Sequence, residues 1–318
     1  MKSCPDCWNL IEAAINGHLE CLKYWKGSSR WDKYVCVEAA QYGNLQCLQY
    51  AHENGCEWDK EVCVRAAKYG RLDCLQYAHK NGCPWDKDVC KFAARHGRLD
   101  CLQYAHKNGC PWDKDVCAHA ALRGHLDCLQ YAHEKGCDWD KWTCAFAALN
   151  GHLDCLQYAH DKGCDWNAET CTNAAQYGHL QCLKYAHENG CLWYKDVCSY
   201  AAENGHLDCL QYAHKNGCPW DEETCTNAYE NRHLDCIEYA HKNGCPCSHT
   251  KMKLFDDVDD VESHNENTEC GICYHNCNKV QFKPCNHKLC ISCSNQLIAR
   301  EPVNCPFCRA SVEANDML

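Results

Sequence analysis

The stretch CLQYAHKNGCPWDKDVC occurs twice without a change, at residues 74–90 and at residues 101–117. It belongs to a longer unit that approximates W-D-x-x-V/T-C-x-x-A-A-x-x-G-x-L-x-C-L-x-Y-A-H-x-x-G-C-x. The turn glycine of this unit recurs at Gly17, Gly43, Gly70, Gly97, Gly124, Gly151, Gly178 and Gly205, and becomes Arg232 in the last unit. After one step of 26 residues the spacing is 27 each time, which makes nine units. Self-similarity at such a period predicts a solenoid of stacked units.

The unit that starts at Asp59 predicts two short helices. Its apolar residues share a helix face in two runs, Val62, Cys63, Ala66 and Ala67, then Leu72, Cys74, Leu75 and Ala78. The first helix should stop at Gly70 and the second at Asn81-Gly82. Asp59, like Asp86 and Asp113 in later units, is placed to cap the first helix. Because two short helices cannot bury their faces alone, neighbouring units must stack.

The stretches A-A-x-x-G-H-L and G-C resemble the ankyrin repeat. The unit is shorter than the family norm of about 33 residues, and the missing residues fall in the loop G-C-x-W-D. The resemblance therefore implies that the β-hairpin fingers of the family are reduced to turns. This Cys- and Trp-rich version looks most like the arrays encoded by large DNA viruses of amoebae, although a protist homologue is equally compatible. We expect an ankyrin-like array over residues 1–245.

The repeat cysteines differ in spacing from metal ligands. Cys63, Cys74, Cys83 and Cys90 follow one another at steps of 11, 9 and 7 residues, never at the C-x2-C or C-x4-C spacing of a zinc site. We expect them to pack as small hydrophobic side chains, with a metal array as the alternative. Cys4-Pro-Asp-Cys7 is a lone C-x2-C, which we interpret as an irregular cap.

A histidine and a tryptophan also recur in each unit. The histidine before each G-C could satisfy loop carbonyls at the helix end, which we favour, or bind a metal with the cysteine four residues later. This set is His52, His79, His106, His133, His160, His187, His214 and His241. The tryptophans should pack loop against loop, in place of the lost hairpins, with a carbohydrate or base-stacking platform as the alternative.

The two positions between A-A and the turn glycine vary most between units. By the ankyrin resemblance they face the concave groove that binds other proteins. The candidate substrate-binding residues are Tyr42, Tyr69, Arg95, His96, Arg123 and Tyr177. The positions change from cationic and aromatic early in the array to acidic late, which would orient an extended partner. The alternative is a set of solvated helix ends without a function.

A second domain follows the array. Residues 246–269 are acidic, with few apolar anchors, and indicate a flexible linker. The segment 270–309 then places Cys270, Cys273, Cys285, His287, Cys290, Cys293, Cys305 and Cys308 at paired spacing. Eight such ligands can close two tetrahedral zinc sites, and a domain this small needs them to fold. Residues 310–318 form a short tail without the aromatic ending of some dimeric domains of this kind, which favours a monomer.

The motifs C-x-I-C, P-C-x-H, C-x-x-C and C-P-F-C-R resemble a RING finger of the C3HC4 type, similar to the Cbl ligases. The resemblance implies that the zinc sites interleave. One Zn²⁺ would be held by Cys270, Cys273, Cys290 and Cys293, and the other by Cys285, His287, Cys305 and Cys308. The expected fold class is therefore a mostly α, ankyrin-like solenoid of 27-residue units followed by a small zinc-bound RING domain.

The same resemblance implies a surface for a ubiquitin-conjugating enzyme that carries ubiquitin. Ile272, Leu297 and Pro306 match its apolar contact positions, and Arg309 matches the arginine that holds the ubiquitin thioester in a reactive pose. We therefore expect a RING-type ubiquitin ligase with no covalent intermediate of its own, whose repeat array binds an unknown protein substrate. The alternative is a non-catalytic protein-binding scaffold with a structural zinc module.

Composition excludes other classes of function. With 46% hydrophobic and 24% charged residues, the 318-residue chain resembles an ordinary soluble protein. It opens without the apolar core of a signal peptide, and no run approaches the roughly 18 apolar residues of a membrane helix. We expect a cytoplasmic protein, in the host cytoplasm if it is viral, that is neither secreted nor bound to a membrane. The formal charge of -11 disfavours nucleic acid as a partner.

Overall fold

The computed structural model describes residues 7–27, 29–247, 279–281 and 288–290. The chain divides into two compact units, Met1–Pro246 and Cys247–Leu318. In the second unit the described residues form two antiparallel strands, β1 (Lys279–Gln281) and β2 (Lys288–Cys290), with Val280 opposite Leu289.

The described part of the first unit contains eighteen helices in nine pairs. The first helices of the pairs are α1 (Leu10–Ile15), α3 (Tyr34–Tyr42), α5 (Lys60–Lys68), α7 (Lys87–Arg95), α9 (Asp115–Leu122), α11 (Lys141–Leu149), α13 (Ala168–Gln176), α15 (Lys195–Glu203) and α17 (Glu222–Glu230). The second helices are α2 (Leu19–Lys26), α4 (Leu45–Glu53), α6 (Leu72–Lys80), α8 (Leu99–Lys107), α10 (Leu126–Glu134), α12 (Leu153–Asp161), α14 (Leu180–Glu188), α16 (Leu207–Lys215) and α18 (Leu234–Lys242). The nine predicted units are thus confirmed as helix pairs.

Local sequence sets where these helices begin and end. The side chain of Asp59 accepts a hydrogen bond from the backbone N–H of Glu61 at the start of α5, as a helix cap does. After α5, Gly70 adopts a left-handed φ of 72°, and the N–H of Arg71 donates to the carbonyl of Ala66. This closing turn requires a positive φ, which glycine adopts without a steric penalty. Arg232 takes the same conformation, with a φ of 60°, where the ninth unit lacks the glycine.

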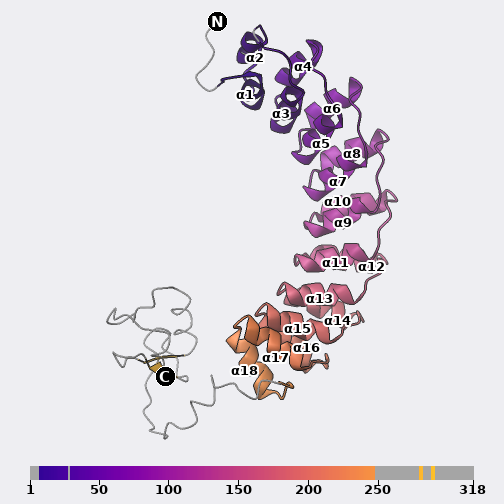
Figure 1. Ribbon diagram of the computed structural model, residues 1–318. Helices are drawn as coiled ribbons and strands as arrows, with labels where there is room; N and C mark the ends of the chain where they lie inside the picture. Colours follow the sequence, from indigo (N-terminus) through magenta and orange to yellow (C-terminus); the bar gives the residue numbers. More distant parts are fainter. Residues whose placement is uncertain (1–6, 28, 248–278, 282–287, 291–318) are drawn as a thin grey trace. The chain divides into compact units, whose positions relative to one another are not determined.

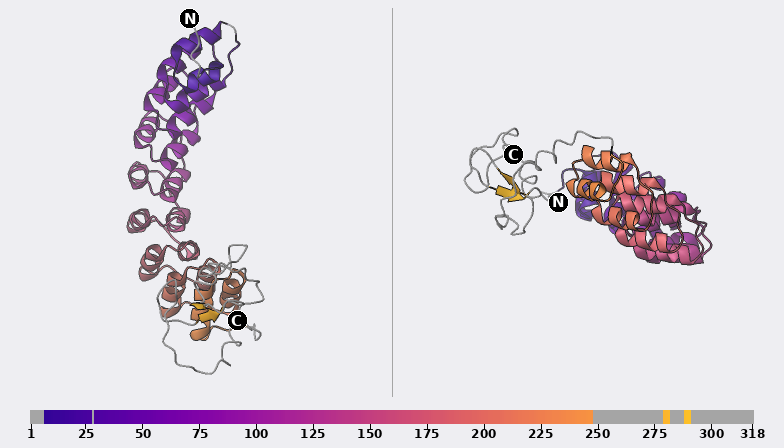
Figure 2. Two further views of the ribbon diagram at one scale, coloured as in Figure 1. Left: turned by 90° about the vertical axis from the view of Figure 1, so that its left-hand side faces the viewer. Right: turned by 90° about the horizontal axis from the view of Figure 1, so that it is seen from below.

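The helix pairs stack into a curved array of two layers. Each first helix packs against its own second helix and against the adjacent first helices, more extensively than the second helices pack against one another. The first helices consequently line the inner side of the curve in Figure 1, and Figure 2 shows the array from two further sides. The core lies between the layers, where residues such as Ala66, Ala67 and Leu75 are completely buried. A solenoid of this kind buries a continuous core through contacts between neighbours alone.

The loops between units are short and irregular, as expected. Residues 81–86, which join one unit to the next, form a two-residue turn followed by four residues without regular secondary structure. Over residues 7–27 and 29–247 the structure has no strand, so the β-hairpin fingers are absent from this part of the chain. Within the same ranges no helix has both the length and the apolar character needed to span a bilayer.

Candidate functional site

The recurring histidine, tryptophan and tyrosine connect each unit to the next. The His79 ring at the end of α6 stacks on Trp85 in the following loop, with ring centroids 3.8 Å apart. Its Nδ1 lies 2.9 Å from the hydroxyl of Tyr104 in the next second helix. The same arrangement occurs at His52, His79, His106, His133, His160, His187 and His214.

These contacts show what the recurring tryptophans and histidines do in the array. The tryptophans are structural, but they pack against a helix end and the next second helix, and not loop against loop as expected. The histidines are also structural, but the expected partner is wrong, since the imidazole pairs with a tyrosine hydroxyl and not with a loop carbonyl. Their position in sequence conceals this, because the tyrosine is 25 residues further along.

The repeat cysteines lie inside the array. Cys63 and Cys74 are buried, and burial raises the pKa of the Cys74 thiol to about 12. A thiol of this kind stays protonated at neutral pH and is a poor nucleophile. Cys83 does more than fill space, because its Sγ lies 3.2 Å from the carbonyl oxygen of Asp59 and donates to it. The equivalent cysteine makes the same bond in later units, for example Cys110 to Asp86, which explains a cysteine where ankyrin repeats carry alanine.

The candidate groove residues lie at the carboxyl ends of first helices, on the inner layer. Tyr42 and Tyr177 are 46% and 49% exposed, and Arg123 is also exposed. Tyr69, Arg95 and His96 are half-buried. A shallow hollow of about 280 Å³ beside Tyr42 is lined by residues of two neighbouring turns. The predicted residues are therefore accessible, but they are spread along the array and do not converge on one pocket.

A cluster of positive charge surrounds His96. The pKa of its imidazole is lowered, first by burial and then by the charges of Lys68, Arg95, Arg98 and Arg123. Four cations near one imidazole produce a positive potential over the third to fifth units.

Most of the predicted zinc and ubiquitin-transfer residues lie outside the described residues. This holds for Ile272, Leu297, Pro306 and Arg309, for the linker beyond Cys247, and for seven of the eight zinc ligands. The eighth, Cys290, is described only as the last backbone position of β2.

Two groups of metal-type ligands occur in the described residues, one at each end of the array. Cys7, His18 and Cys21 have their ligand atoms within 4.8 Å of one another, and so do Cys225, His241 and Cys247. In the second group, Cys247 holds the loop position at which earlier units carry tryptophan. Cys225 and Cys247 are disulfide-bonded. Sequence spacing did not reveal either group.

Comparisons with known proteins support both domains. Residues 90–170 match the family described as ankyrin repeats (3 copies), and residues 266–315 match the zinc finger of C3HC4 type, the RING finger. The chain therefore carries ankyrin repeats and a C-terminal RING-type zinc finger, and a RING finger binds zinc.

Individual relatives match parts of the chain. A 45-residue segment is 49% identical to the E3 ubiquitin-protein ligase AIRP2 of Arabidopsis thaliana. The matched segment is 14% of this chain and 18% of that protein. The human ASB11 ankyrin repeat domain superimposes with a TM-score of 0.44 and 17% identity, over 49% of this chain and 84% of that one.

Proposed function

We propose that this protein is a RING-type ubiquitin ligase whose ankyrin repeats bind a protein substrate. The RING match over residues 266–315 carries the proposal, since domains of this type bring a charged ubiquitin-conjugating enzyme to a substrate. The partial match to a plant protein named as an E3 ligase supports it. The proposed site of action is the cytoplasm.

The donor set of the RING segment suits two Zn²⁺ ions. Seven thiols and one imidazole, in closely spaced pairs, are the soft ligands that tetrahedral zinc takes in structural sites. We assign Cys270, Cys273, Cys290 and Cys293 to one ion, and Cys285, His287, Cys305 and Cys308 to the other. The ions would hold the fold together, so the loss of one ligand should unfold the domain.

The proposed mechanism is positioning. Ile272, Leu297 and Pro306 supply apolar contacts for the conjugating enzyme. Arg309 would hold ubiquitin against that enzyme, because a planar guanidinium can donate to carbonyl groups of both proteins at once. Orientation of the thioester for attack by a substrate lysine lowers the barrier without a nucleophile from the ligase.

The array would select the substrate through its inner layer. Its early positions carry the cations around His96, whereas the equivalent late positions include Glu203 and Glu230. A partner segment with acidic residues at one end and basic residues at the other would bind in a single orientation. Such a segment is the class of substrate that we propose.

The first experiment is ubiquitin-chain formation by the full-length protein with an activating enzyme and a panel of conjugating enzymes. Wild-type protein should form chains, and Ile272→Ala should lose this activity with unchanged zinc content. Leu192→Ala removes an exposed leucine of the array and is the matched control, which should keep full activity. Absence of chains with every conjugating enzyme, from folded and zinc-loaded protein, would instead support the scaffold.

A further inference from the structure

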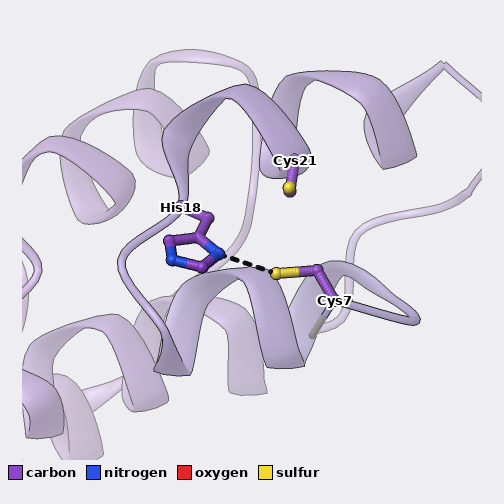
Figure 3. Close-up of side chains that lie close together, drawn as sticks. All are labelled: Cys7, His18 and Cys21. Carbon is purple, nitrogen blue, oxygen red and sulfur yellow. Dashed lines mark hydrogen bonds between the residues drawn. The ribbon is translucent and has the colours of Figure 1, made fainter. Parts of the chain in front are cut away.

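The amino-terminal end of the array brings two thiols and an imidazole together (Figure 3). Cys7 lies before α1, His18 is the residue that precedes α2, and Cys21 lies in the first turn of α2. The Sγ of Cys7 is 3.2 Å from Nδ1 of His18, and all three ligand atoms lie within 4.8 Å of one another. Both cysteines are buried, whereas His18 is exposed. The segment before α1 and the start of α2 therefore meet at one point.

The geometry is compatible with a tetrahedral ion. Zinc bonds of about 2.3 Å to sulfur and about 2.0 Å to nitrogen place neighbouring ligand atoms about 3.5 to 3.8 Å apart. The Sγ of Cys7 and Nδ1 of His18 are 3.2 Å apart, and all three ligand atoms lie within 4.8 Å of one another, so small side-chain movements would bring them to these separations. Two thiols and an imidazole are a donor set that favours zinc over hard cations such as Mg²⁺ and Ca²⁺.

The histidine and cysteine at the equivalent positions of inner units have a different environment. The pair H-x2-C recurs as His125 and Cys128, and again as His152 and Cys155. There the imidazole forms a hydrogen bond with the backbone of the preceding unit, His125 with Arg95 and His152 with Leu122. Among the described residues no third ligand joins either pair. His18 meets a cysteine from outside the repeat pattern instead, which makes the first unit chemically distinct.

We propose that Cys7, His18 and Cys21 bind a Zn²⁺ ion that closes the amino-terminal end of the array. Cys4 lies outside the described residues, and in the sequence it stands at C-x2-C spacing to Cys7. In the sequence, Cys4-x2-Cys7 and His18-x2-Cys21 are two pairs at the spacing that structural zinc sites use. The interpretation of Cys4 and Cys7 as an irregular cap misses the second pair, because His18 and Cys21 match the repeat consensus.

The ion would replace contacts that a terminal unit lacks. End repeats of a solenoid have a neighbour on one side only and need a cap. The first helix α1 has 6 residues, whereas α3 and α5 have 9. A zinc ion that joins the segment before α1 to the start of α2 would hold this short pair in place, and its binding energy would become folding energy.

The direct test is zinc per chain in the full-length protein, measured by mass spectrometry after dialysis against metal-free buffer. Cys7→Ser and Cys21→Ser should each contain one zinc ion fewer than the wild type. Cys155→Ser is the matched control, since Cys155 occupies the position of Cys21 in an inner repeat unit. The zinc content of this variant should equal the wild-type value. Equal zinc in all four proteins would overturn the proposal.

A second set of variants separates ligand loss from misfolding. His18 is exposed, so His18→Ala should fold and yet lose one zinc ion, while His18→Cys supplies another zinc ligand and should keep it. Hydrogen exchange gives a local readout, because a chelator should accelerate exchange in α1 and α2 of the wild type. Unchanged exchange in α1 and α2, or full zinc in His18→Ala, would contradict the site.

Discussion

Three threonines in the core of the array have unsatisfied hydroxyl groups. Thr143, Thr170 and Thr224 stand at the V/T position of the unit, where other units have Val62 or Val89. Each is completely buried, and its Oγ1 has no hydrogen-bond partner. A buried hydroxyl loses its bonds to water without replacement, which costs about 1 to 3 kcal/mol.

Replacement by the residue of the other units should therefore stabilise the protein. Thr143→Val should raise the free energy of unfolding by about 1 kcal/mol, because it removes the hydroxyl and keeps the branched shape. Thermal and urea unfolding, followed by circular dichroism, measure the change. The reverse substitution Val89→Thr is the control and should destabilise. A Thr143→Val protein no more stable than the wild type would show that the hydroxyl has a partner.

The histidines that follow the turn glycines should make the stability of the array depend on pH. Burial lowers the pKa values of His125, His152 and His179 below the ordinary value of 6.5. The unfolded chain therefore binds more protons than the folded one in this range. The stabilisation is complete above about pH 6.5 and is lost as the pH falls towards the lower folded pKa values.

A variant that keeps the contact but cannot titrate tests this pH dependence. Asn44 holds the same register as His152, and its amide donates to the carbonyl groups of Ala14 and Ile15 in the preceding unit. We therefore consider a triple variant with His125→Asn, His152→Asn and His179→Asn. Its melting temperature should fall less between pH 7 and pH 5 than that of the wild type. Parallel pH profiles for the two proteins would refute the assignment.

At the scale of helices and loops, the His–Trp–Tyr contact takes over the role of the missing hairpins. It links the end of one second helix to the next loop and to the next second helix, as His106 does with Trp112 and Tyr131. Large aromatic side chains bury much area and contribute directional contacts in addition. The repeat can thus be short and still connect its units firmly.

Loss of a tryptophan that takes part in a His–Trp–Tyr contact should destabilise the protein strongly, and loss of a tryptophan outside these contacts should not. Trp112→Ala should lower the free energy of unfolding by about 3 kcal/mol or more, because it removes packing on both sides of one unit boundary. Trp142→Ala is the control, since Trp142 is 39% exposed at the start of α11 and takes part in no His–Trp–Tyr contact. Urea unfolding measures both variants. An equal decrease in the free energy of unfolding for the two variants would show that the His–Trp–Tyr contact has no special role.

Residue pattern predicts these elements well but not their contacts. The apolar spacing, the caps such as Asp59 and the turn glycines are local signals, and the helices begin and end where they indicate. The partners of His79 and Cys83 depend on residues about 25 positions away and on the stacking geometry, which spacing does not contain. The sequence pattern conceals the group of Cys7, His18 and Cys21 for a different reason, because His18 and Cys21 match the repeat consensus.

At the scale of the whole molecule, cysteine has two different uses. In the repeats the thiols are buried at helical spacing and serve packing or a bond to a carbonyl, as Cys74 and Cys83 show. In the RING segment and at Cys4 and Cys7 they stand in close pairs, the spacing of zinc ligands. As proposed, the repeats bind a protein over an extended surface, and the RING segment recruits the ubiquitin machinery.

The most direct test of the ligase proposal is single-turnover discharge of ubiquitin from a charged conjugating enzyme onto free lysine. Full-length wild-type protein should accelerate discharge, and Arg309→Ala should abolish the acceleration while its zinc content stays the same. Arg123→Ala, an exposed arginine of the array, should discharge at the wild-type rate because free lysine needs no substrate groove. Acceleration that survives Arg309→Ala would contradict the positioning mechanism, and no acceleration with any conjugating enzyme would contradict the ligase itself.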